Sequence, residues 1–266
     1  MVAATPGIDP GRIKSSVAIG AEHIRKQFGH VTALRDASIS VHHGEIVALC
    51  GDNGAGKSTF LRTLQGIHRP DSGSIIIDDT PVTLNSVRDA QALGVDTVHQ
   101  DLALAPDLSA VDNIFLGHER TRSGLLGRLG ILDHKQMAEQ AAAALRELAI
   151  VLPSLQVQVR DLSGGQRQAL AVARAVMWSK TAVLMDEPTA ALGAKQSEVV
   201  VNLMRTVAGR GLGVLVVSHD LPRVLEVADR VVVLWRGETV LNARASELTV
   251  PELVATMVGH KQSAAA

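Results

Sequence analysis

The sequence has a single cysteine, Cys50, among its 266 residues. One thiol excludes a disulfide framework within the chain and any zinc site built from a cluster of cysteines. A protein without disulfides fits a reducing compartment best.

Long apolar runs and an excess of positive charge are also missing. The longest apolar runs, such as Val214–Val217 and Val231–Trp235, are far shorter than the roughly 20 residues that cross a bilayer. The start, Met1–Ser16, has no apolar signal core, and we expect residues 1–17 to be a flexible tail. Lys and Arg number 26 against 27 Asp and Glu, so we expect no nucleic-acid partner. These absences predict a cytoplasmic protein.

Hydrophobic residues make up 46% of the chain, which is enough to bury a sizeable core in one domain. Short Val/Ile/Leu runs alternate with stretches of helical spacing, which predicts an α/β fold with a mostly parallel sheet. The predicted strands are Glu45–Cys50, Ser74–Ile77, Gly94–His99, Thr181–Met185, Gly213–Val217 and Val231–Leu234. Closely spaced β-type runs within Ala18–Asp79 predict an additional N-terminal antiparallel β layer.

The texture of the sequence changes between residues 106 and 160. Ser109–Leu116 and His134–Leu148 have helical spacing, whereas Arg120–Gly130 is rich in Gly and Arg and resembles a loop. We therefore expect a helical subdomain at about 106–160, inserted into one domain that spans 18–260. Residues 261–266 are expected to form a second flexible tail.

A P-loop pattern follows the predicted strand that ends at Cys50. The segment reads Gly51-Asp52-Asn53-Gly54-Ala55-Gly56-Lys57-Ser58 and is followed by Thr59. Its glycines allow successive backbone N–H groups to point inward around an anion, and the next helix adds its positive N-terminal end. In such a loop the lysine reaches the β- and γ-phosphates and the serine hydroxyl ligates Mg²⁺. The pattern predicts that the chain binds ATP with Mg²⁺.

Two further motifs lie where a nucleotide site needs them. Asp186 and Glu187 end a short apolar strand, so Asp186 is the expected direct or indirect partner of Mg²⁺ and Glu187 the base that polarises a water. A lone Asp there would more simply cap the strand. Leu162-Ser163-Gly164-Gly165-Gln166 opens a helical run and is a second possible anion site, although Ser163 alone would be an ordinary N-cap.

Together these motifs resemble the ATP-binding-cassette (ABC) ATPase family, over roughly residues 18–260. The resemblance implies that two cassettes stack head to tail, with each ATP between the P-loop of one chain and the signature of the other. The partner's ATP would then be contacted by the signature residues Ser163, Gly164, Gly165 and Gln166. A chain with one cassette would therefore act as a homodimer.

The same resemblance assigns roles to three residues outside these motifs. Gln100 matches the loop glutamine that contacts Mg²⁺ and water, and His219 matches the histidine that contacts the γ-phosphate; without the family, each would be a polar residue at a strand end. Phe28 matches the aromatic side chain that stacks on adenine, in a chain with three Phe and no Tyr. Its alternative is a small packing contact.

One segment departs from the family pattern. After Pro188-Thr189 the family usually has a Ser-Ala-Leu-Asp type stretch, whereas this chain reads Ala190-Ala191-Leu192-Gly193. The resemblance therefore does not extend to the contact across the dimer that this carboxylate would make.

Several stretches look closest to the ATPases of bacterial ribose-, xylose- or fructose-type importers. These stretches include residues 68–73, 99–104 and 113–117. This likeness implies an ATPase at the inner face of the cell membrane, bound to integral membrane permease subunits that a periplasmic or extracellular solute-binding protein supplies. The alternatives are a transporter for another solute, or a soluble ABC ATPase that acts on ribosomes or DNA.

Overall fold

The computed structural model describes residues 13–190 and 192–259 of the chain. Most of the first tail expected from the sequence (1–12 of 1–17) and all of the second (261–266) lie outside these residues, and Val17 is already the first residue of a strand.

Ten strands form one hydrogen-bonded order, β5-β4-β1-β2-β10-β9-β3-β8-β7-β6. The strands β9, β3, β8, β7 and β6 run parallel to one another, as the apolar runs predict. Their bounds are β3 Ile46–Cys50, β6 Val95–Val98, β7 Ala182–Asp186, β8 Gly213–Val217 and β9 Arg230–Trp235. The predicted motifs thus lie at the carboxyl ends of these parallel strands.

The predicted antiparallel layer is present at the N-terminal side. It consists of β1 Val17–Phe28, β2 Val31–His42, β4 Ser72–Ile77 and β5 Thr80–Val82. One parallel pair, Glu238↔Asp36, links it to β10 Glu238–Arg244, which itself runs antiparallel to β9. The antiparallel strands therefore continue the same sheet.

Alternating residues of the parallel strands face two separate cores. On β3, Ile46, Ala48 and Cys50 pack on one side and Val47 and Leu49 on the other, and all five are fully buried. This strand is apolar on both faces because both faces are covered. The helix α1, Lys57–Leu64, belongs to the second core, in which it packs with β1 and β2 residues.

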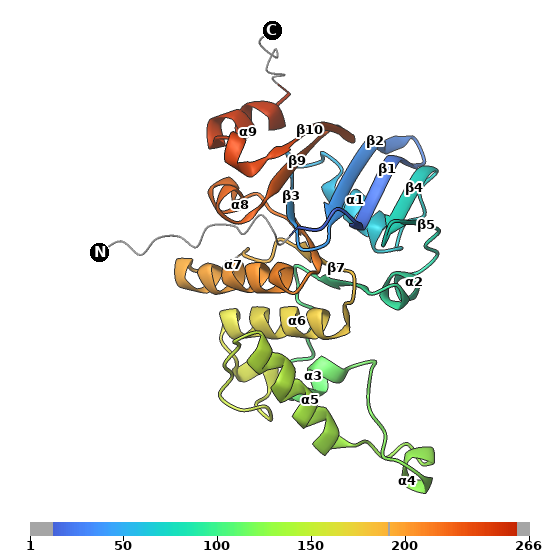
Figure 1. The fold of residues 1–266 in the computed structure, drawn as a ribbon, viewed down its shortest axis with the longest axis vertical. Helices are drawn as coiled ribbons and strands as arrows, with labels where there is room; N and C mark the ends of the chain where they lie inside the picture. Colours follow the sequence, from blue (N-terminus) through green and yellow to red (C-terminus); the bar gives the residue numbers. More distant parts are fainter. Residues whose placement is uncertain (1–12, 191, 260–266) are drawn as a thin grey trace, which may run out of the picture.

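The buried Ala90 of α2 belongs to the same core as α1, whereas most of the remaining helices cover the other face and build the helical part. Figure 1 shows α6 lying between α7 and α5, with α4 at the far end from the sheet. The bounds are α2 Val87–Ala92, α3 Ala110–Phe115, α4 Leu125–Arg128, α5 His134–Glu147, α6 Gly164–Trp178, α7 Ala194–Gly209, α8 Leu221–Val227 and α9 Val250–Met257, with short 3-10 turns η1 Val159–Asp161 and η2 Ala245–Glu247. The prediction of a loop over Arg120–Gly130 is wrong at α4, since Leu125–Arg128 forms a single helical turn that the Gly-rich composition did not indicate.

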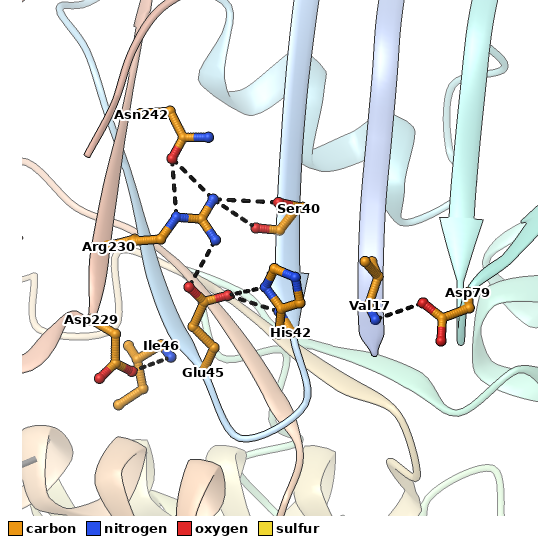
Figure 2. A network of polar contacts seen from close by, with 9 residues as sticks. All are labelled: Val17, Ser40, His42, Glu45, Ile46, Asp79, Asp229, Arg230 and Asn242. Atoms are coloured by element: carbon orange, nitrogen blue, oxygen red, sulfur yellow. Dashed lines mark hydrogen bonds and ion pairs between the residues drawn. The ribbon is translucent and has the colours of Figure 1, made fainter. Parts of the chain in front are cut away.

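A buried ion pair joins four strands near the start of β3 (Figure 2). The side chain of Glu45 is 3% exposed, and its Oε1 accepts a hydrogen bond from Arg230 at 2.8 Å. Its Oε2 accepts from the backbone N–H of His42, and the same guanidinium also donates to Asn242 and Ser40. The network ties the antiparallel strand β2 to β9 and β10.

Candidate nucleotide site

The P-loop connects β3 to α1, and its close packing requires glycine at two points. A Cβ at Gly51 would lie 2.4 Å from the carbonyl oxygen of Leu234, and one at Gly56 would lie 2.8 Å from that of Ala33. Gly56 also has a φ of 106°, which side chains rarely adopt. Neighbouring strands therefore hold the loop in a conformation that other residues would disrupt.

Ten of the predicted site residues, from three segments, line one cavity of about 320 Å³ beside this loop. Lys57 and Ser58 come from the start of α1, Gln100 follows β6, and Asp186 and Glu187 lie at the end of β7. The rest of the lining is Val31, Thr32, Ala33, Asn53, Gly54, Ala55, Gly56, Thr59 and Val217. The fold thus brings the P-loop, the loop glutamine and the two acids to one place.

Lys57 folds back over the loop that precedes it. Its Nζ donates hydrogen bonds to the carbonyl oxygens of Gly51 at 2.7 Å and Asp52 at 3.0 Å. Both are ordinary hydrogen bonds to uncharged acceptors, so an anion in the cavity would be a stronger partner for this ammonium group.

The two acids at the end of β7 occupy different environments. Burial raises the pKa of Asp186, and the neighbouring Glu187 raises it further, while His99, Arg62 and Lys57 oppose the shift. Because a cation beside Asp186 would favour its charged form, this carboxylate suits a cation-binding position.

Glu187 is held in an unusual backbone conformation at the strand end. Its φ is 48°, a left-handed value that costs a non-glycine residue about 1–3 kcal/mol. Its N–H donates to the carbonyl oxygen of Val217, and its Oε1 lies 3.2 Å from Nδ1 of His219. Neighbouring strand β8 therefore positions both Glu187 and the predicted histidine, although His219 does not line the cavity.

The signature segment begins α6, as its Ser-Gly-Gly turn predicts. Ser163 is the N-cap, its Oγ accepts from the N–H of Gln166, and Gln166 Oε1 accepts from the N–H of Ser163 at 2.9 Å. The described lining of the P-loop cavity contains none of Ser163–Gln166. In a single chain the two predicted anion sites are therefore separate.

Phe28 ends β1 and does not line the cavity in this structure. Its side chain is 43% exposed and contacts the ring of His68 edge-on, with centroids 5.0 Å apart. Its partner across the strand pair, Val31, does line the cavity. Sequence reasoning missed Val31, Thr32 and Ala33, because they carry no motif and reach the cavity only through the pairing of β1 with β2.

Comparison with known proteins decides the family. The family model described as ABC transporter matches residues 34–190, more than half of the chain. The chain belongs to the ABC transporter family. This ABC cassette is 44% identical to a xylose/arabinose import ATP-binding protein of Sulfolobus acidocaldarius over 234 residues, which are 88% of this chain and 91% of the relative. It is 42% identical to a fructose import ATP-binding protein of Rhizobium meliloti, over 91% of this chain and 94% of the relative.

Solved structures show the same ABC cassette fold. An ATP-binding cassette of an ABC transporter in its ADP conformation superposes with a TM-score of 0.77 at 24% identity, covering 93% of this chain and 97% of the other. A dimeric bacterial ABC transporter cassette gives 0.70 at 25% identity, covering 85% and 98%. This ABC cassette is an ATPase, and none of its described helices is long and apolar enough to span a bilayer.

Proposed function

We propose that this ABC ATPase hydrolyses Mg·ATP as a homodimer and so powers import of a monosaccharide. The observation that carries the ATP part is the single cavity lined by Lys57, Ser58, Gln100, Asp186 and Glu187. It combines a cation for phosphate, oxygen ligands for a metal and a carboxylate for a water, which is what phosphoryl transfer to water requires.

The donor set at one side of the cavity fits Mg²⁺. Ser58, Gln100 and Asp186 offer a hydroxyl, an amide and a carboxylate oxygen, and Mg²⁺ prefers hard oxygen ligands. When bound, the ion would neutralise charge on the phosphates. Lys57 and the N–H groups of residues 51–59 would hold the β- and γ-phosphates, and Phe28 would have to turn toward the base to stack on it.

Glu187 is the proposed general base. The residue lines the cavity, and its Oε1 lies 3.2 Å from Nδ1 of His219, a contact that orients the carboxylate. Glu187 accepts the proton of the attacking water, and His219 contacts the γ-phosphate.

The proposed substrate and partners are inferred from the functions of similar proteins. Relatives named as ATP-binding proteins of xylose/arabinose, fructose and ribose import favour a monosaccharide importer. We infer that the cassette docks on permease subunits at the inner face of the membrane, supplied by an extracellular or periplasmic solute-binding protein. In the reconstituted complex, pentoses or fructose should stimulate ATP hydrolysis. Stimulation by an amino acid instead would favour a transporter for a non-sugar solute. Co-purification with ribosomes or DNA would favour a soluble ABC ATPase.

Glu187→Gln tests the proposed chemistry. Gln keeps the size of the side chain but cannot accept the proton, so hydrolysis should slow by about 10²–10⁴-fold. ATP affinity should change little because the P-loop is untouched, and the ATP-bound dimer should accumulate on size exclusion with ATP but not ADP. A near wild-type rate would remove Glu187 from the mechanism and leave His219 as the next candidate.

A further inference from the structure

The segment that departs from the family pattern has its own local arrangement. Gly193 is the N-cap of α7 and has no side chain that could accept a hydrogen bond from the helix. Instead, Oε1 of Gln196, three residues on, accepts the N–H of Gly193 at 2.9 Å. The chain thus closes the start of α7 with an amide where the family usually has an N-terminal carboxylate.

The same side chain packs on the signature turn. A Cβ at Gly165 would lie 3.0 Å from Cγ and 3.3 Å from Cβ of Gln196, so the backbone of Gly165 and the stem of Gln196 are already in contact. Leu192 makes the neighbouring contact, since its Cδ2 would lie 3.6 Å from a Cβ at Gly164. The starts of α6 and α7 therefore meet through Gln196 and Leu192.

We propose that Gln196 is a positioning residue that fixes the signature turn of this ABC ATPase. Its amide oxygen holds the backbone of Gly193 through a hydrogen bond, and its aliphatic stem packs against Gly165. The starts of α6 and α7 therefore move as one unit. The inference rests on the proposed function, in which Ser163 and Gly165 meet ATP on the partner chain. Gln196 thus orders, from within the same chain, a helix start that carries glycine where the family usually has a carboxylate.

Two substitutions separate the two contacts of Gln196. Gln196→Leu keeps an apolar stem against Gly165 but loses the acceptor for Gly193, whereas Gln196→Ala loses both. Gly193→Asp should compensate in the Leu background, because Gly193 has extended N-cap angles (φ −70°, ψ 165°). Among the described residues, a Cβ there would meet only Gln196 Oε1, at 3.4 Å, which the Leu variant lacks. The new carboxylate can accept an N–H of the first helical turn and so caps α7 at a different donor from the Gly193 N–H. Glu198→Gln, an exposed change on the same helix, is the matched control.

The experiment measures hydrolysis by the full chain, and ATP-dependent dimer formation in the Glu187→Gln background. Loss of a helix cap predicts a fall of about fivefold for Gln196→Ala in both readouts, a smaller fall for Gln196→Leu, and recovery in Gly193→Asp/Gln196→Leu. ATP affinity of the monomer should stay at the level of Glu198→Gln, because neither Gln196 nor Gly193 lines the P-loop cavity. The melting temperature should fall by only about 2–4 °C, as expected for a lost helix cap.

Three results would overturn the inference: a Gln196→Ala variant that matches Glu198→Gln in both readouts, a parallel loss of monomer ATP affinity, or no recovery with Gly193→Asp. If instead the wild-type chain neither hydrolyses ATP nor dimerises with it, the proposed function itself fails.

Discussion

At the scale of single residues, Lys57 shows how the cavity is prepared for an anion. Its ammonium group already lies over the loop, bound to two carbonyl oxygens that a phosphate would replace. Hydrogen bonds to charged groups are worth about 1.5–3 kcal/mol, so Lys57→Ala should weaken ATP binding by about ten- to a hundredfold. Calorimetric titration checks this, with the exposed Lys135→Ala as control. Equal affinity in both variants would contradict the P-loop assignment.

Cys50 directly precedes the P-loop, yet its thiol should be inert. Burial raises its pKa to about 12, and the nearby Lys57 offsets only part of the shift. At pH 8.5 about half of an unperturbed thiol is ionised, against roughly one in three thousand at that pKa. Iodoacetamide should therefore label the folded chain at least about a hundredfold more slowly than the urea-unfolded chain. Similar rates would show that the strand end opens readily.

The sign of the pH effect on stability follows from the same shift. The folded state keeps the Cys50 proton between pH 8.5 and 12, where the unfolded state loses it. This group therefore stabilises the fold fully below pH 8.5 and contributes less as the pH rises through that window.

The site residues differ in how far the sequence could predict them. Lys57, Ser58, Asp186 and Glu187 were identifiable because phosphate and metal chemistry demands those types beside a strand end. The left-handed φ of Glu187 was not, because it depends on the N–H bond to Val217 on a neighbouring strand. Gln196 was missed for the same reason, since its contact with Gly165 joins two helices that are distant in the sequence.

At the scale of secondary-structure elements, the ion pair between Glu45 and Arg230 holds the antiparallel strands to the parallel ones. Removing one member of a buried pair typically costs about 3–5 kcal/mol because the other charge is left without compensation. Arg230 keeps Asn242 and Ser40 as partners and is 18% exposed, so Glu45→Ala should lower the free energy of unfolding by about 3 kcal/mol.

Urea denaturation measures this loss, with the exposed Glu22→Ala as the control that should change stability by less than about 0.5 kcal/mol. The double variant Glu45→Leu/Arg230→Met should recover most of the loss, since apolar replacements of a buried pair are often neutral. A double variant as unstable as Glu45→Ala would mean that packing, and not the unpaired charge, sets the cost.

Element types followed from the sequence where the pattern was strong. The apolar run Gly213–Val217 became β8 with the same bounds, because a strand covered on both faces leaves a continuous hydrophobic signature. The single turn α4 and the short edge strand β5 were not predicted, since each has too few residues to show a period. The two parts of the sheet share a single ladder pair, Glu238↔Asp36, which leaves no pattern in the sequence.

At the scale of the whole molecule, the two predicted anion sites are separate. The P-loop cavity and the signature turn do not share a cavity in one chain, which supports the proposal that the signature acts on nucleotide bound by a second copy. Hydrolysis should then require two chains, and specific activity should rise with protein concentration.

Mixing two inactive variants tests this arrangement. Lys57→Ala destroys the P-loop of one chain, and Ser163→Arg blocks the signature of the other. In a mixed dimer one site combines both defects, while the other combines an intact P-loop with an intact signature. Random pairing at equal amounts makes half of the dimers mixed, so hydrolysis should recover to at most about a quarter of the wild-type rate.

The melting temperature of Ser163→Arg serves as its control, because Ser163 is also the N-cap of α6 and its loss alone costs about 1 kcal/mol. A folded variant that is inactive alone and active in the mixture places the defect between chains. Absence of recovery, together with activity that does not depend on protein concentration, would contradict the head-to-tail dimer. Each chain would then have to complete its site alone, which requires the signature turn to reach the cavity beside Lys57.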